Sequence, residues 1–96
     1  MAFGIRFNEE KNQLLKATRG VSFEEILDTI RAGYLLADIA HPSRKHTHQR
    51  LYVVRIHEHA YAVPYVSNPL KREIFLKTAY PSRALTKKYI KGDTHA

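Results

Sequence analysis

The chain contains no cysteine and no tryptophan, and it has only four glycines and no long apolar segment. Without cysteine it can form neither a disulfide framework nor a thiolate zinc site. No apolar run approaches the roughly 20 residues that a membrane-spanning helix needs. The sequence has no glycine-rich phosphate-binding loop and no G-x-S-x-G motif, so nucleotide hydrolysis and dinucleotide binding are disfavoured.

The first residues also lack the apolar core and the small-residue cleavage site of a secretory signal peptide. Together with the absence of cysteine, this predicts a cytoplasmic protein with no membrane partner. Of the 96 residues, 44% are hydrophobic and 26% are charged, which is ordinary for a globular protein. No repeat or linker interrupts the chain, so we expect a single domain over residues 1–96.

Acidic residues are scarce in the second half of the chain. Residues 1–40 hold five Lys/Arg and six Asp/Glu, a net charge of −1, whereas residues 41–96 hold eleven Lys/Arg and three Asp/Glu, a net charge of +8. All six histidines also lie in the second half. This imbalance predicts binding to a polyanion, most simply RNA, through release of counterions. The alternatives are a solvated basic surface and a surface that docks on an acidic protein.

Two helices are predicted near the start. The first covers Glu9–Arg19, with Asn8 as its N-cap and Gly20 where a helix commonly ends. The second begins at the S-x-x-E capping box that Ser22 and Glu25 form. Its apolar residues follow the i, i+3, i+4, i+7 pattern of one buried face, and they are Phe23, Ile26, Leu27 and Ile30.

The remaining segments favour strands. Alternating or apolar runs occur at Phe3–Phe7, Gln49–His57, Ala60–Val66 and Glu73–Tyr80, with Glu58-His59 as a tight turn. Tyr34–Ala40 is either a strand or an extended connector, and Pro64 argues for an edge strand or a bulge. A basic helix is expected from Ser82 to Gly92. The predicted fold class is α+β: a strand and two helices, then an antiparallel β-meander and a basic C-terminal helix, with the helices on one face of the sheet.

The expected C-terminal helix carries a cationic stripe. Arg83, Lys87 and Lys91 repeat every four residues and would share one face. Arg83 lies close to the start of the helix, where free backbone N–H groups favour phosphate. Leu85 is placed to anchor the helix to the sheet. A solvated basic surface is the alternative interpretation of this stripe.

Two further cations fall on strands. Arg50 and Lys77 each have apolar neighbours, which places them on a face of the sheet. Together with Arg83, and with Tyr52 or Tyr80 stacking on a base, they would form a site for a phosphate and a base. The alternative is that they are edge-strand charges that discourage aggregation.

Three histidines cluster at His41, His46 and His48. Imidazole can transfer protons near neutral pH and could act as acid or base in RNA cleavage. His48 is the better candidate because it directly precedes a strand, whereas His41 and His46 are expected in a mobile polar loop. A metal site is disfavoured, because the spacing matches no recognised motif and no acidic ligand is near. No metal or cofactor is predicted.

The order of these motifs resembles that of the BrnT-family toxins. Phe7–Asn12, Lys16 and the segment Arg19–Glu25 (Arg-Gly-Val-Ser-Phe-Glu-Glu) are similar to the start of those proteins, which usually have histidine where Arg19 stands. Ser82–Lys88 is similar to the family's closing Ala-Arg-Lys-Ala-Thr and basic helix, although Pro81-Ser82 replaces the usual small residues. The middle of the chain is matched only as a strand meander.

The resemblance implies a RelE-like fold and a ribonuclease toxin of a toxin–antitoxin pair. Such toxins inhibit translation and growth by cleaving RNA without a metal ion, the 2′-hydroxyl attacking its own phosphate, until a small DNA-binding antitoxin neutralises them. Ribosome-bound mRNA is one candidate substrate. Arginine and lysine would stabilise the charge that develops at phosphorus.

The alternative is a non-catalytic module that binds RNA or docks on a protein through the same surface. On the toxin interpretation the catalytic residues are His48, Arg50, Lys77 and Arg83, and the RNA-binding residues are Lys16, Arg19, Tyr80, Lys87, Lys88 and Tyr89.

Overall fold

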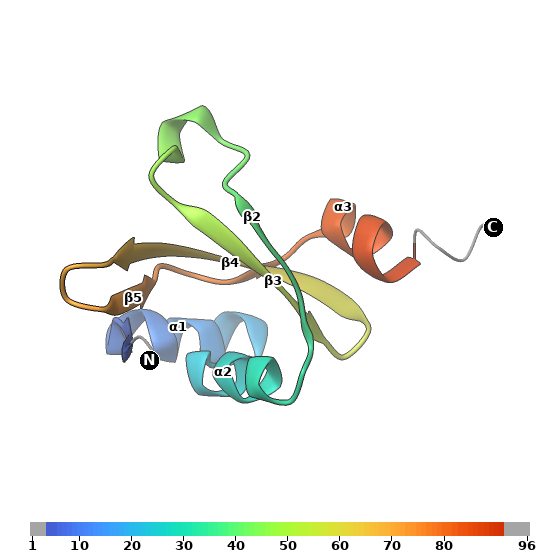
Figure 1. Ribbon diagram of the computed structural model, residues 1–96. Coiled ribbons are helices and arrows are strands. Elements are labelled where there is room, and N and C mark those ends of the chain that lie inside the picture. The colour runs from blue at the N-terminus through green and yellow to red at the C-terminus, as the bar shows by residue number, and fades with distance from the viewer. Residues whose placement is uncertain (1–3, 92–96) are drawn as a thin grey trace.

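The computed structural model describes residues 4–91, and it is an α+β fold built on one mixed sheet (Figure 1). No helix within these residues is long and apolar enough to cross a membrane. The elements are β1 (Gly4–Phe7), α1 (Glu9–Arg19), α2 (Phe23–Arg31), β2 (Leu35–Ala40), β3 (Arg50–Ile56), β4 (His59–Asn68), β5 (Glu73–Leu76), β6 (Tyr80–Pro81) and α3 (Arg83–Thr86), with a 3₁₀ turn η1 (Arg44–His46) and a π-helical turn η2 (Lys87–Lys91).

The two N-terminal helices begin at the caps that the sequence predicts. In α1 the Asn8 side chain accepts a hydrogen bond from the Lys11 N–H at 2.9 Å, and the helix ends at Gly20, whose φ of 71° lies in the left-handed region that glycine tolerates. In α2 the Ser22 hydroxyl accepts from the Glu25 N–H at 3.0 Å. The predicted bounds of α1 are confirmed.

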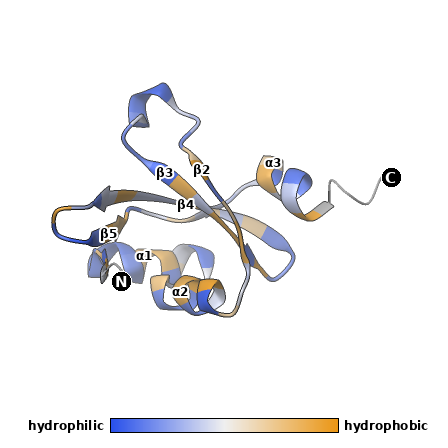
Figure 2. Ribbon diagram, viewed as in Figure 1, coloured by the Kyte–Doolittle hydropathy of each residue, from blue (hydrophilic) through white to orange (hydrophobic). Residues whose placement is uncertain are grey.

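The hydrophobic core lies between α1, α2 and one face of the sheet. Phe23 and Ile26 of α2 are fully buried and pack with Leu15 of α1 against the sheet. Figure 2 shows the apolar stripes of both helices turned toward the strands. The sheet contributes alternate residues of its central strands, as expected for one buried face, and these are Val54, Ile56, Tyr61, Val63, Tyr65 and Leu76.

The strand order is β1-β5-β4-β3-β2, with β6 beside β4. The helical pair carries the chain from β1 at one edge to β2 at the other, and the meander then returns until β5 lies beside β1 (Figure 1). Since β1 and β5 pair in parallel, the predicted wholly antiparallel sheet is wrong at this edge. The predicted run Phe3–Phe7 corresponds to β1, except that Phe3 lies outside the described residues.

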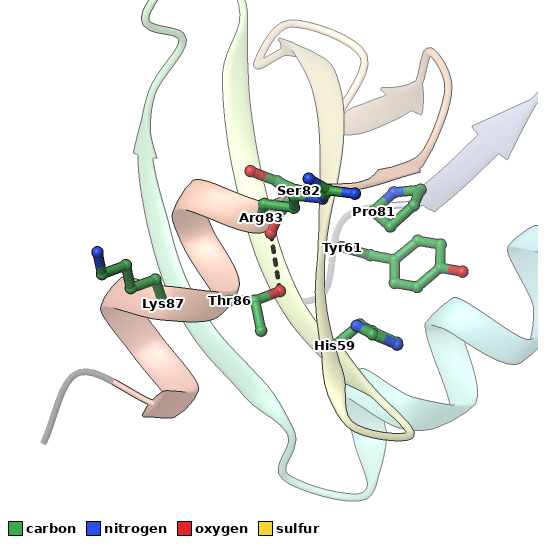
Figure 3. Close-up of a pocket in the computed structure, with 7 residues that line it drawn as sticks. All are labelled: His59, Tyr61, Pro81, Ser82, Arg83, Thr86 and Lys87. Atoms are coloured by element: carbon green, nitrogen blue, oxygen red, sulfur yellow. Dashed lines mark hydrogen bonds between the residues drawn. The ribbon is translucent and has the colours of Figure 1, made fainter. Parts of the chain in front are cut away.

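The expectation that all helices cover one face is also wrong. α1 and α2 cover one face, whereas α3 packs against β4 from the other side (Figures 1 and 3). The apolar residues that β3 and β4 direct to this second face need cover of their own, and Val53, Ala60 and Ala62 are all fully buried. Gly92, the expected end of the C-terminal helix, lies outside the described residues.

Pro64 lies in β4, which is a central strand, so the first of the two alternatives for this proline, an edge strand, is wrong. The second alternative, a bulge, agrees with the register, because Tyr65 pairs with Leu76 and Ala62 with Tyr80, which leaves one extra residue opposite β4. The Pro64 carbonyl accepts from the Lys77 N–H at 2.8 Å, on the side where β5 has already ended and β6 has not yet begun. In a strand the nitrogen of a residue faces the same side as its carbonyl. The missing N–H of Pro64 therefore faces this interruption, which divides the predicted run Glu73–Tyr80 into two strands.

The turn between β3 and β4 is His57-Glu58, one residue earlier than predicted.

Candidate nucleic-acid interface

The two glutamates in the described part of the second half are paired with arginines. Within residues 41–91, Glu58 lies 3.7 Å from Arg55, and Glu73 lies 3.6 Å from Arg6 of β1. The other cations of this part, Arg50 and the side chain of Lys91 apart, form no ion pair with any described residue. These cations are Arg44, Lys45, Lys71, Arg72, Lys77, Arg83, Lys87 and Lys88.

Arg50, a predicted catalytic residue, is held by Asp38 of the neighbouring strand. Its Nε lies 3.0 Å from Asp38 Oδ1, and its Nη2 donates to the Asp38 carbonyl oxygen at 2.9 Å. The pairing of β2 with β3 sets Asp38 opposite Tyr52, next to the Arg50 position. Asp38 therefore neutralises the positive charge of Arg50, which we had predicted to bind a phosphate.

Two tyrosines complete this cluster. The Tyr65 hydroxyl donates to Asp38 at 2.6 Å, and its ring stacks on that of Tyr52 with centroids 4.0 Å apart. Burial, and then the hydrogen bond to Asp38, raise the pKa of Tyr65, and burial raises that of Tyr52. Both phenols stay protonated near neutral pH, so the cluster is a fixed network that orients Arg50.

A second group of side chains gathers at the end of the sheet where β2 ends, β3 begins and β5 ends. There an open pocket of about 470 Å³ contains Lys77 and Tyr80, both predicted site residues, and also Lys11 from α1. We name it the His41–Lys77 pocket. No carboxylate is among the described residues that line it, which are Lys11, His41, Ser43, His46, Gln49, Pro64, Lys77, Thr78 and Tyr80.

The segment from His41 to Gln49, expected as a polar loop, is a turn held by hydrogen bonds. The Ser43 hydroxyl caps η1 by accepting from the Lys45 N–H, and backbone hydrogen bonds join His46 to Ser43 and His41 to Gln49. Figure 2 shows this turn as mostly hydrophilic. It brings the rings of His41 and His46 together, with centroids 4.8 Å apart. His48 is exposed and does not line the pocket.

His41 is partly buried, and its ring is fixed by the backbone. Its Nδ1 accepts a hydrogen bond from the Ser43 N–H at 3.1 Å. Burial, and then the neighbouring His46, lower the pKa of His41. The pocket thus holds a neutral imidazole beside two lysines. Sequence reasoning missed Lys11 and undervalued His41, because their neighbours in the pocket come from distant segments.

Arg83 lies in a different pocket, of about 770 Å³, beside α3 (Figure 3). We name it the α3 pocket. Figure 3 shows Lys87 directed away from His59 and Tyr61, although all three residues line it. Neither Lys77 nor Arg50 is among its described lining residues, which are His59, Tyr61, Pro81, Ser82, Arg83, Thr86 and Lys87. The structure therefore does not gather the four predicted catalytic residues in one place.

Thr86, which the sequence did not single out, anchors α3 to the sheet. Its hydroxyl accepts from the Ala60 N–H at 2.8 Å and donates to the Ser82 carbonyl at 2.7 Å (Figure 3). Leu85, the expected anchor, is only partly buried. The available signal was a threonine four residues after the Ser82 cap, since such a hydroxyl reaches the carbonyl of residue i−4.

The predicted RNA-binding residues occupy several surfaces. Lys16 and Arg19 are exposed in the last turn of α1. Lys88 Nζ lies 5.4 Å from the centre of the Tyr89 ring, over one of its two faces. Tyr80 lines the His41–Lys77 pocket and Lys87 the α3 pocket.

Within residues 4–91 there is no group of three or more His, Asp or Glu residues arranged to hold a metal ion. Comparison of the chain with protein-family models, curated proteins and solved structures found no match.

Proposed function

We propose that this protein is a cytoplasmic, RNA-cleaving toxin of a toxin–antitoxin pair, which binds RNA through its basic surface and cleaves it without a metal ion. The proposal that the protein binds RNA rests on the excess of positive charge on its surface. Glu58 and Glu73 are engaged with Arg55 and Arg6, so they do not neutralise the lysines and arginines around them. A surface of this kind binds a phosphate backbone by releasing its counterions.

Cleavage is supported by the His41–Lys77 pocket and by the resemblance to BrnT-family toxins. The pocket is lined by His46, whose imidazole is a proton-transfer group, and by Lys11 and Lys77, and proton transfer and charge stabilisation at a phosphate need groups of these kinds. A RelE-like identity of the fold is part of the same proposal. It is supported by the order of elements, a strand and two helices followed by a meander and a terminal helix.

The test is expression of the gene alone, followed by purification. Induction should stop bacterial growth and degrade cellular RNA, and the purified protein should cleave RNA at an unchanged rate in excess EDTA. Normal growth with intact RNA at confirmed soluble expression would contradict the toxin proposal.

The second candidate is a non-catalytic module that binds RNA through the same surface. It is favoured by the separation of the predicted catalytic residues, since Asp38 holds Arg50, and Lys77 and Arg83 line different pockets. Tight binding of RNA that remains uncleaved after long incubation would select this candidate.

A further inference from the structure

The His41–Lys77 pocket concentrates positive charge that forms no contact ion pair with any described residue. Lys11 reaches it from α1 and Lys77 from the segment after β5, and neither forms an ion pair within residues 4–91. Glu10 lines the adjacent pocket beside both lysines, but it lies beyond ion-pair distance of them. Lys77 Nζ lies 5.3 Å from the Phe75 ring centre, and such a cation–π contact at an exposed site is weak enough for the ammonium group to move to an anion.

The hydrogen bond to His41 Nδ1 decides what this imidazole can do. A neutral imidazole has one N–H, and the Ser43 N–H donates to Nδ1 at 3.1 Å, so the hydrogen is carried by Nε2. If Nδ1 were protonated, its N–H would face the Ser43 N–H, and the hydrogen bond between them would be lost. The neighbouring His46 acts in the same direction, and Lys11 and Lys77, which line the same pocket, also disfavour a positive charge on His41. The other titratable side chain among the described lining residues is Tyr80. His41 is therefore an uncharged donor with its N–H on Nε2.

We propose that the His41–Lys77 pocket is a phosphate subsite of the RNA-binding surface, where Lys11 and Lys77 supply the charge and His41 Nε2–H supplies a directed hydrogen bond. This inference rests on the proposed binding of RNA and names the place where one of its phosphates is held. A phosphate group presents several acceptor oxygens, so it can meet two ammonium groups and an N–H together.

Two substitutions at His41 separate ligand binding from support of the turn. In His41→Asn the side-chain oxygen can replace Nδ1 as the acceptor for Ser43, but the distal donor is lost. In His41→Gln a donor can lie near the Nε2 position, but the acceptor for Ser43 is displaced. The subsite predicts that His41→Asn weakens RNA binding more than His41→Gln. A purely structural role predicts the opposite order.

The ligand is a 2′-O-methyl RNA oligonucleotide, which cannot undergo attack by its own 2′-hydroxyl, and its affinity is measured by fluorescence anisotropy. His41→Asn should weaken binding about tenfold, as expected for one hydrogen bond to a charged group. Lys11→Gln and Lys77→Gln should each lower the dependence of log K on log salt by about one. His57→Asn is the matched control, because it removes an imidazole at an exposed position whose φ of 58° suits asparagine. Equal affinities for His41→Asn, Lys77→Gln and the control would overturn the subsite.

The pH dependence provides a second readout. Because the pKa of His41 is lowered, the ring is already neutral at pH 7, so the ratio of wild-type to His41→Asn affinity should stay constant from pH 7 to 8.5. A ratio that falls toward one over this range would mean that a cationic His41 is required, and it would overturn the neutral-donor assignment. In ¹H–¹⁵N spectra the free protein should show the Nε2–H tautomer, and the signals of His41 should shift on adding RNA.

Competing ligands distinguish the source of the anion. RNA should shift the His41 ring signals at concentrations where inorganic phosphate and poly-glutamate do not. Occupancy by inorganic phosphate alone would mark a site for free phosphate, and occupancy by poly-glutamate as tight as by RNA would mark an acidic protein partner. Either result would overturn the inference.

If wild-type protein binds the oligonucleotide here but leaves natural RNA uncleaved, the toxin proposal fails and the subsite stands. If it cleaves RNA while the His41 and Lys77 variants match the control, the subsite fails and the toxin proposal stands.

Discussion

The two cationic pockets of this molecule are assembled in different ways. In the α3 pocket, Arg83 and Lys87 come from one short segment, and no other lysine, arginine, aspartate or glutamate is among its described lining residues. In the His41–Lys77 pocket, the cations and imidazoles come from α1, from the turn around η1 and from the segment after β5. A charge pattern within one helix can be recognised along the sequence, whereas charges brought together by folding cannot. On the proposed function, we expect the His41–Lys77 pocket to serve chemistry and the α3 pocket to serve attachment.

The largest expected effect is on the cleavage rate. We predict that Lys77→Ala lowers the single-turnover rate at saturating RNA by about 10²–10³, the loss typical when one donor to a developing charge is removed. Arg83→Ala should leave that rate nearly unchanged and instead weaken binding, because Arg83 lies in the other pocket. Rates for both variants, with melting temperatures close to that of the wild type, make the comparison. A larger loss of rate for Arg83→Ala would assign the chemistry to the α3 pocket.

The next effect is on stability, at the contact that attaches α3. Thr86→Val keeps the shape of the side chain but removes the acceptor of the buried Ala60 N–H, which should cost about 1–3 kcal/mol of unfolding free energy. Thr18→Val is the matched control, because Thr18 makes the same kind of bond to a carbonyl four residues back at an exposed site. Urea denaturation should show a clear loss only for Thr86→Val. Equal losses in both variants would mean that α3 is held by its apolar contacts alone.

A smaller effect is expected for a lysine that attracts RNA through its charge without contacting the reacting phosphate. Lys88 is exposed, and its ammonium group lies over the Tyr89 ring, so it acts on RNA only through its charge. Lys88→Gln should lower the slope of log K against log salt by about one and leave the saturated cleavage rate unchanged. A fall in that rate would place Lys88 close to the reacting phosphate, against the comparison drawn here.

The smallest effect concerns a residue that is not among the described lining residues of either pocket, and it depends on pH. The hydrogen bond from Asn12 lowers the pKa of Glu24, so Glu24 stabilises the fold above the pKa of an ordinary glutamate, 4.5, and this contribution is lost as the pH falls through the lowered value. Glu24→Gln should therefore reduce the acid dependence of the melting temperature below pH 4.5. An unchanged acid profile would show that this carboxylate contributes nothing to folding.

The sequence was enough to predict the features that neighbouring residues determine, such as the ends of the helices. Asn8, Gly20 and Ser22 mark helix boundaries through groups within four residues of each other, and the structure confirms these caps. The parallel pairing of β1 with β5 and the placement of α3 on the second face depend on contacts between distant segments. For the same reason Pro64 could not decide between an edge strand and a bulge, because the irregularity that accommodates it lies in the segment between β5 and β6.

The candidate site was predictable only in part. Lys77 and Tyr80 were chosen and lie in one pocket. Asp38, however, neutralises Arg50 through a cross-strand contact that depends on the register of β2 and β3. His41 gained its fixed ring orientation from a backbone N–H of the turn, which no pattern of side chains reveals.

The pairing of β1 with β5 has a consequence for the timing of folding. Gly4 lies opposite Glu73 and Phe7 opposite Leu76, so this edge closes only after most of the chain has been synthesised, and contacts of such long range form late. Lys11 follows β1 and Lys77 follows β5, so the same closure brings these two lysines to one pocket. An incomplete chain on the ribosome therefore lacks the pocket, although its helices can already form. If the pocket carries the activity, a cell that makes this protein meets that activity only after synthesis has passed β5.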